Sequence, residues 1–153
     1  MTRVGLISDT HGRLRSEVFD HLQGVDLILH AGDIGTPNII TELETIAPVH
    51  AVHGNTDGFD VRALYHEKVE LELEGQRVVV THGHLLGSPK PAQLRLLYPG
   101  ANIIVYGHTH EPLLDAGPPL VVNPGAAGPA RFHLKPSVAI VAVPSLEVTF
   151  FEI

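Results

Sequence analysis

The stretch that decides the fold is Val4-Gly5-Leu6-Ile7-Ser8-Asp9-Thr10-His11, an apolar run of strand length that ends directly in a carboxylate and an imidazole. A second apolar run covers residues 25–30, and between the two runs apolar residues such as Val18 and Leu22 recur at helical spacing until Gly24. Buried parallel strands joined by helices produce this pattern, because a parallel connection needs a crossover. We therefore predict a strand–helix–strand unit at the N-terminus.

The remaining chain continues this alternation and then changes character after residue 60. Val69, Leu71 and Leu73 alternate with glutamates, which is typical of a strand with one wet face, and a hairpin partner follows. Further strands are expected at residues 49–52, 69–74, 78–81, 103–106, 121–122, 138–143 and 146–150, and further helices at 39–46 and 91–97. The prediction is an α/β fold with parallel units early, antiparallel strands late and two sheets packed together.

The composition sets limits on the function. With 153 residues, 44% of them hydrophobic, the chain is predicted to form one domain over residues 1–153. Its apolar runs are too short to span a bilayer and its start lacks a secretory leader, so we expect a cytoplasmic protein that does not act in a membrane. The absence of cysteine excludes disulfides and thiolate metal sites, and the formal charge of −7 argues against an extended nucleic-acid surface. A homo-oligomer stays open.

Residues able to hold a metal follow five of the expected strands. Because ligands bind at the carboxyl ends of strands in α/β sheets, these turns can meet in space. The turns are Asp9-Thr10-His11, Gly32-Asp33, Gly54-Asn55-Thr56-Asp57, His82-Gly83-His84 and Gly107-His108-Thr109-His110. Carboxylates, imidazoles and a carboxamide suit Mn²⁺, Fe, Co, Ni or Zn²⁺ better than Ca²⁺ or Mg²⁺. A single carboxylate such as Asp33 can bridge two ions, so a two-metal centre is predicted.

Taken in order, these blocks resemble the five-block signature of the calcineurin-like metallophosphoesterases, from Val4 to about Arg131. The lengths and the turn Asn123-Pro124-Gly125 are similar to the small bacterial and archaeal phosphodiesterase branch. The resemblance implies a sandwich of two mixed β-sheets flanked by helices. It also implies one metal held by Asp9, His11, Asp33 and His110, and a second held by Asp33, Asn55, His82 and His108.

The same resemblance implies a metal-dependent phosphodiesterase that hydrolyses P–O bonds of a small phosphate ester with a hydroxide bridging two metal ions. Mn²⁺ is the expected ion, with Fe, Ni, Co or Zn²⁺ as alternatives, and Asn55 would also contact a substrate oxygen. Two other functions stay open: a phosphomonoesterase, and a protein-binding scaffold like the retromer-coat subunit of the same family. Lost ligands would favour the scaffold, and none of the ligand positions is lost here.

The sequence departs from the family pattern after Asn55. Many members have a histidine there that acts on the leaving group, whereas this chain has Thr56, which cannot donate a proton near neutral pH. We therefore expect substrates with good leaving groups, or His84 or an ordered water as the acid. His84 is the catalytic candidate, against a solvated loop histidine, while His30 and His53 are expected to orient or pack the loops.

Overall fold

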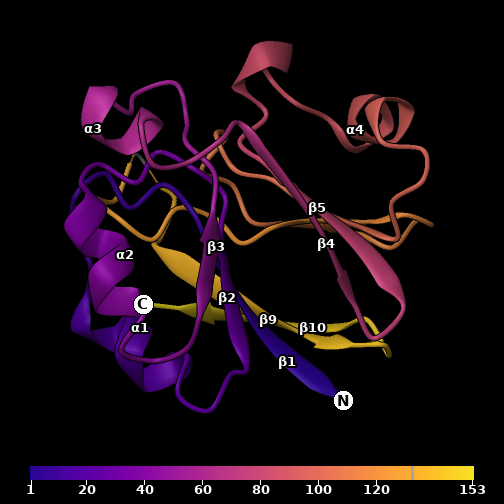
Figure 1. Cartoon of the computed structure of the whole chain (residues 1–153), viewed down its shortest axis with the longest axis horizontal. Coiled ribbons are helices and arrows are strands. Elements are labelled where there is room, and N and C mark those ends of the chain that lie inside the picture. Colours follow the sequence, from indigo (N-terminus) through magenta and orange to yellow (C-terminus); the bar gives the residue numbers. More distant parts are fainter. Residues whose placement is uncertain (132) are drawn as a thin grey trace.

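Two mixed sheets form the framework of the protein (Figure 1). The structure is a computed structural model that describes residues 1–131 and 133–153. Over these residues the first sheet has the strand order β10-β9-β1-β2-β3, in which β1, β2 and β3 are parallel and β9 and β10 are antiparallel to their neighbours. Its strands are β1 (Thr2–Ile7), β2 (Leu27–His30), β3 (Val49–Ala51), β9 (Ser137–Val143) and β10 (Glu147–Glu152).

The second sheet has the order β4-β5-β6-β8-β7 over the same described residues. Its central strands β5, β6 and β8 are parallel, and the edge strands β4 and β7 pair antiparallel with β5 and β8. Its strands are β4 (Lys68–Leu73), β5 (Gln76–Thr81), β6 (Ile103–Val105), β7 (Leu113–Asp115) and β8 (Leu120–Asn123). The predicted α/β class with two mixed sheets is confirmed.

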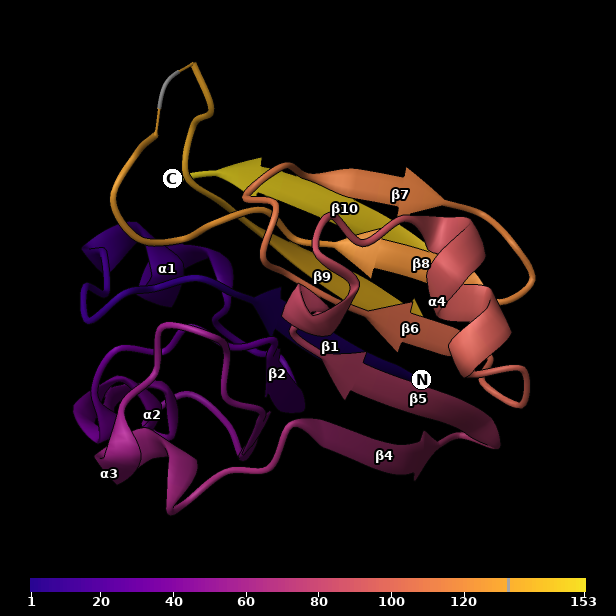
Figure 2. The same cartoon turned by 90° about the horizontal axis from the view of Figure 1, so that it is seen from above.

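Helices cover the outer faces of the two sheets. Figures 1 and 2 show α1, α2 and α3 on one side of the molecule and α4 on the other. The helices are α1 (Ser16–His21), α2 (Pro37–Leu43), α3 (Phe59–Arg62) and α4 (Pro91–Leu97), with a 3-10 turn η1 (His84–Leu86). No helix in the described part of the chain is long and apolar enough to cross a membrane.

The alternation along each strand divides the core into three layers. Val4 and Leu6 of β1 point into the layer between the sheets, while Ile7 lies in the layer shared with α1 and α2. The second sheet repeats the scheme, since Val80 packs between the sheets and Val79 packs against Leu94 of α4. Strands buried on both faces explain why the sequence shows unbroken apolar runs rather than an apolar–polar alternation.

Three short elements were absent from the sequence prediction: α3, η1 and β7. Each has only three or four residues, too few to show a helical or strand period. The helix expected at 39–46 ends at Leu43, yet Ile46 still packs against the core beneath α2. The glutamates of β4 are exposed and its apolar residues face the inter-sheet layer, as predicted.

Candidate metal centre

Five loops meet where the parallel strands β1, β2, β3, β5 and β6 end, and they bring together residues from both sheets. Backbone hydrogen bonds join the loops. The amide of Asp9 donates to the carbonyl of Gly32 at 2.9 Å, and the amide of His11 donates to the carbonyl of Asp33 at 3.0 Å. Across the sheets, the amide of His108 donates to Asp9 Oδ2 at 3.1 Å. The strand ends therefore converge as the sequence predicted.

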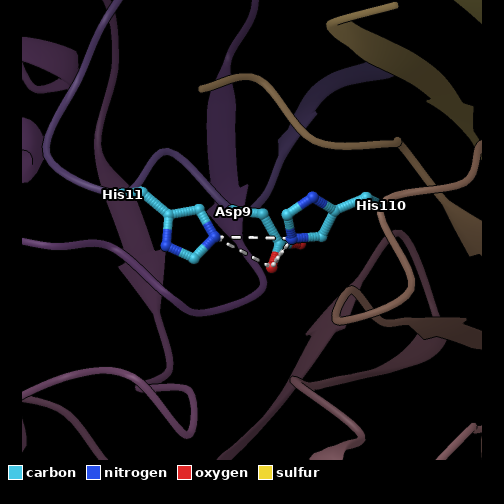
Figure 3. A group of neighbouring side chains, drawn as sticks. All are labelled: Asp9, His11 and His110. Carbon is cyan, nitrogen blue, oxygen red and sulfur yellow. Dashed lines mark hydrogen bonds and ion pairs between the residues drawn. The ribbon is translucent and has the colours of Figure 1, made fainter. Parts of the chain in front are cut away.

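The carboxylate of Asp9 lies at the centre of three imidazoles. Its Oδ1 atom is 3.4 Å from His110 Nε2, 3.9 Å from His11 Nε2 and 3.8 Å from His82 Nε2. Figure 3 shows the His11 and His110 rings on either side of the Asp9 carboxylate, with their Nε2 atoms 3.4 Å apart. Asp9 Oδ1 is buried and accepts no hydrogen bond from any residue the structure describes.

The carboxylate of Asp33 extends the same cluster. Its Oδ2 atom is 3.3 Å from His82 Nε2 and 3.8 Å from His11 Nε2. Asn55 completes this side, because its Oδ1 atom is 3.1 Å from His82 Nε2. The amide of Thr56 donates to Asp33 Oδ1 at 3.0 Å and holds the carboxylate in place.

His108 is the predicted ligand whose side chain contacts the cluster least. Its ring centroid is 5.2 Å from that of His82, and its strongest link to the cluster is the backbone amide that donates to Asp9. Ligand atoms that lie within 4.8 Å of one another form two sets among the described residues: Asp9, His11 and His110, and Asp9, Asp33 and His82. The structure therefore brings six predicted side chains into contact and leaves the His108 ring adjacent.

The chemistry of these atoms fits a cation. His82 Nδ1 lies 2.7 Å from the carbonyl of Ala31, which can only accept, so Nδ1 carries the proton in a neutral ring. The lone pair of Nε2 then faces the Asp33 carboxylate at 3.3 Å. Two lone pairs repel at this distance unless a proton or a metal lies between them. Together with the unpartnered Asp9 Oδ1, this arrangement supports metal binding.

The backbone is strained at this cluster. Asp9, His11, Asp33, His108 and His110 have φ angles of 54°, 48°, 53°, 73° and 65°, in the left-handed region that L residues rarely occupy. Among the described residues, they are five of the seven non-glycine residues with positive φ. Such conformations cost about 1–3 kcal/mol each and are concentrated at functional sites. Here all five residues lie in the loops that form the cluster.

Charges in the cluster shift several pKa values. Burial works against the charged form of Asp9, but the nearby His110, His82 and Ser8 side chains outweigh it and lower the pKa of the carboxyl. Burial of Asp33 is likewise outweighed by His82 and Thr56, so its pKa is also lowered. The same carboxylates outweigh burial at His82 and raise its pKa. Both carboxylates are therefore anionic at neutral pH, as metal ligands must be.

The pKa values of His11 and His108 are lowered, whereas that of His82 is raised. Burial lowers the pKa of His11 despite the attraction of Asp33 and Asp9. Burial, together with the repulsion of His82, lowers the pKa of His108. Both rings are therefore mainly neutral near pH 7, the form in which an imidazole nitrogen can bind a metal.

Two supporting residues were not identified as such from the sequence. Buried Asp57 accepts hydrogen bonds from the amides of Ile34, Gly35 and Gly54, and so joins the loops that carry Asp33 and Asn55. The short helix α3 adds Arg62, whose Nε donates to the carbonyl of Asp57 at 2.7 Å. An aspartate two residues after asparagine in a Gly-Asn-Thr-Asp turn was the available signal.

The second supporting residue is Asn123 at the end of β8. Its Nδ2 donates to the carbonyl of Gly107 at 3.2 Å and to Thr109 Oγ1 at 3.0 Å, while its Oδ1 accepts from the amide of Gly125. Asn123 thereby holds the loop between His108 and His110. The Asn-Pro-Gly turn is visible in the sequence, but the hydrogen bonds by which Asn123 holds the loop from Gly107 to Thr109 depend on tertiary structure.

His84 lies beside the cluster at the start of η1. Its ring centroid is 5.5 Å from that of His82 and 6.4 Å from that of His108. Its Nδ1 atom is buried and has no hydrogen-bond partner in the described part of the chain. Burial and the repulsion of His82 and His108 lower the pKa of its imidazole.

His30 and His53 support the loops, as predicted. His30 is fully buried; its Nδ1 accepts from the amide of Gly32 at 3.1 Å, so Nε2 carries the proton toward Thr10 Oγ1 at 3.0 Å. The Thr10 hydroxyl donates onward to the carbonyl of Ile34. His53 is also buried, with Nδ1 at 3.4 Å from the carbonyl of Gly54.

The burial of His30 predicts acid sensitivity. Burial lowers its pKa from 6.5 to about 4, so below pH 6.5 the unfolded chain takes up a proton that the folded chain refuses. Stability is therefore lost as the pH falls from 6.5 toward 4, and the His30 share of this loss is about 2 kcal/mol between pH 7.5 and pH 5. Urea unfolding in the presence of chelator, on the native chain and on His30→Gln, measures this share. Equal losses for both proteins would contradict the assignment.

The strand ends, the paired carboxylates and the surrounding imidazoles are those of a metal-dependent hydrolase built on a two-sheet sandwich. A profile of the calcineurin-like phosphoesterase superfamily domain matches residues 2–145. The chain belongs to this superfamily and is a metallophosphoesterase by family.

Relatives in sequence support this membership. The chain is 37% identical to a probable metallophosphoesterase of Methanothermobacter thermautotrophicus, over 92% of this chain and 85% of that protein. It is 32% identical to the phosphodiesterase YfcE of Escherichia coli, over 82% of this chain and 79% of YfcE.

Solved structures share the fold. The zinc-complexed Vps29 of Entamoeba histolytica superposes with a TM-score of 0.83 at 22% identity, covering 99% of this chain and 91% of that one. An archaeal phosphodiesterase superposes with a TM-score of 0.80 at 23% identity, covering 99% of this chain and 100% of that chain.

Proposed function

We propose that this protein is a phosphodiesterase that works with two divalent metal ions. One ion would be held by Asp9, His11, Asp33 and His110, and the other by Asp33, Asn55, His82 and His108. The observation that carries the proposal is the convergence of two anionic carboxylates on the Nε2 atoms of three imidazoles, all within 3.9 Å. Mn²⁺ is the ion we expect, with Fe, Ni, Co or Zn²⁺ as alternatives.

The metal pair, when bound, supplies a nucleophile at neutral pH and neutralises the negative charge that develops on the phosphoryl group. The chain's own residues prepare this site. Asp9 and Asp33 provide the negative charge that binds cations, and Ala31 orients the His82 ring so that Nε2 points inward. The strained loops fix the other imidazoles before any substrate arrives, so little reorganisation is needed on binding.

The position after Asn55 limits the substrates. Thr56 holds Asp33 through its backbone amide, and its hydroxyl cannot donate a proton near neutral pH. We therefore propose that the enzyme favours phosphodiesters with good leaving groups, such as aryl esters.

Chelation tests the proposal. Purified protein with Mn²⁺ is expected to hydrolyse bis(p-nitrophenyl) phosphate, to lose this activity after dialysis against a chelator and to regain it when Mn²⁺ is restored. Turnover that continues unchanged in metal-free protein would contradict the mechanism. Comparison with p-nitrophenyl phosphate under the same conditions separates the diesterase from the monoesterase, which would prefer the monoester.

A protein-binding scaffold is the second candidate function. The TM-score of 0.83 with Vps29 supports it at the level of the fold. The retained set of ligands favours the enzyme, because two buried carboxylates surrounded by imidazoles can bind the metal ions that the hydrolysis needs. A protein without phosphoesterase activity at any metal concentration would favour the scaffold.

A further inference from the structure

A cavity of about 230 Å³ lies next to the candidate metal centre, between η1, α4 and the end of β5. One wall is apolar, formed by four leucines and a tyrosine: Leu85, Leu86, Leu94, Leu97 and Tyr98. Figure 1 shows α4 and the turn that follows β5 on the same side of the second sheet, away from the first sheet. We call this space the His84 cavity.

His84 connects the cavity to the metal centre. It lines the cavity and also lies beside His82 and His108, at 5.5 Å and 6.4 Å between ring centroids. Gly83, which follows His82 directly, lines the cavity as well. A phosphate group at the metal centre would therefore have the cavity beside it, in reach of one of its ester groups.

The lining indicates what the cavity holds. Leu85 and Leu97 line the cavity and are 76% and 53% exposed, so an apolar occupant would cover part of their surface. Lys68 and Glu67 also line the cavity, and Lys68 Nζ lies 5.5 Å from the centre of the Tyr98 ring, where a second aromatic ring would also be attracted to its charge. An apolar cavity of about 150 Å³ holds a benzene molecule, so the volume accommodates one substituted ring.

We infer that the His84 cavity binds an uncharged aromatic ring esterified to the phosphate of the substrate. This inference rests on the proposed function. The cavity holds one ring, so it recognises an aryl ester, and the choice of a diester over a monoester comes from the proposed function. The substrate class is then an aromatic phosphodiester, with His84 and Tyr98 contacting the ring and the metal centre holding the phosphate.

Binding of phosphonates tests this inference without catalysis, because their carbon–phosphorus bond is not hydrolysed. The Zn²⁺-loaded, ¹⁵N-labelled chain is titrated with phenylphosphonate and with methylphosphonate. We expect phenylphosphonate to bind about tenfold more tightly and to shift the amide signals of Gly83, Leu85 and Leu97. Equal affinities, no binding of either probe, or no shifts at these amides would overturn the inference.

Two neighbouring leucines of α4 provide a matched pair of variants. Leu97→Asp places a charge in the cavity wall and is expected to abolish the tenfold preference for phenylphosphonate. Leu96→Asp changes a residue that is 83% exposed and outside the cavity, so it is expected to keep the preference. Loss of the preference in both variants, or in neither, would overturn the inference.

The cavity and the proposed function can fail separately. A preference for phenylphosphonate that depends on Leu97, in a protein that hydrolyses no phosphodiester, would support the cavity and contradict the phosphodiesterase. Metal-dependent hydrolysis of a phosphodiester without any preference for phenylphosphonate would support the phosphodiesterase and contradict the role of the cavity.

Discussion

Asp33→Asn is expected to lower kcat/KM for an aryl phosphodiester by about 100- to 1,000-fold at saturating Mn²⁺. The amide keeps the size of the side chain and can still accept from the Thr56 amide. It removes the negative charge that lies 3.3 Å from His82 Nε2 and 3.8 Å from His11 Nε2, between the two expected metal positions. Bound metal, measured on the same sample, is expected to fall as well.

The matched control is Asp60→Asn on α3. Asp60 is exposed, and its Oδ1 atom accepts a hydrogen bond from the amide of Val61 at 2.9 Å, at the start of its own helix. Activity within about twofold of the native chain is expected, in line with an exposed surface charge. Asp33→Asn activity equal to that of this control would remove Asp33 from the mechanism.

Gly54→Ala is expected to damage the site through packing alone. A β-carbon at this position would lie 2.5 Å from the backbone nitrogen of Asp33 and 2.8 Å from its Cγ atom. Backbone atoms cannot move aside cheaply, so the Asp33 carboxylate must shift. We expect a loss of about 1–3 kcal/mol in the free energy of unfolding, and a loss of activity of about 100-fold because a displacement of about 1 Å is that costly.

Gly58→Ala is the control for this substitution, four residues along the same loop. The nearest atom to its β-carbon would be Asp60 Oδ1 at 3.6 Å, an ordinary contact. Urea unfolding and the phosphodiester assay on both variants check the difference. If Gly54→Ala has the same free energy of unfolding and the same activity as Gly58→Ala, Gly54 does not approach Asp33 as closely as the structure shows.

The sheets could be predicted from the sequence because their central strands are buried on both faces. Val4, Leu6 and Ile7 must be apolar to fill layers on both faces of β1, and this leaves an apolar run that is visible without a structure. The metal-binding side chains were visible for a related reason. Polar residues that follow buried strands closely, such as Asp9 and His82, have few structural roles. Their presence at these positions therefore indicates a functional site in the sequence alone.

The contacts that depend on tertiary structure could not be predicted in this way. Asp57 looks like an ordinary turn residue until its three amide partners are known: Gly54 in its own turn, and Ile34 and Gly35 in the loop that carries Asp33. The His84 cavity was likewise hidden, because Tyr98 and Lys68 come from different elements and meet only in the folded chain. The elements α4 and η1 build this cavity beside the metal centre.

The central claim is that these loops hold two metal ions side by side. Diffraction from crystals grown with Mn²⁺, measured at the manganese absorption edge, tests it most directly. The account predicts two anomalous peaks per chain about 3.5–4 Å apart, one beside Asp9, His11 and His110 and the other beside Asp33, Asn55 and His82. A single peak, or none at these residues in crystals that contain Mn²⁺, would contradict it.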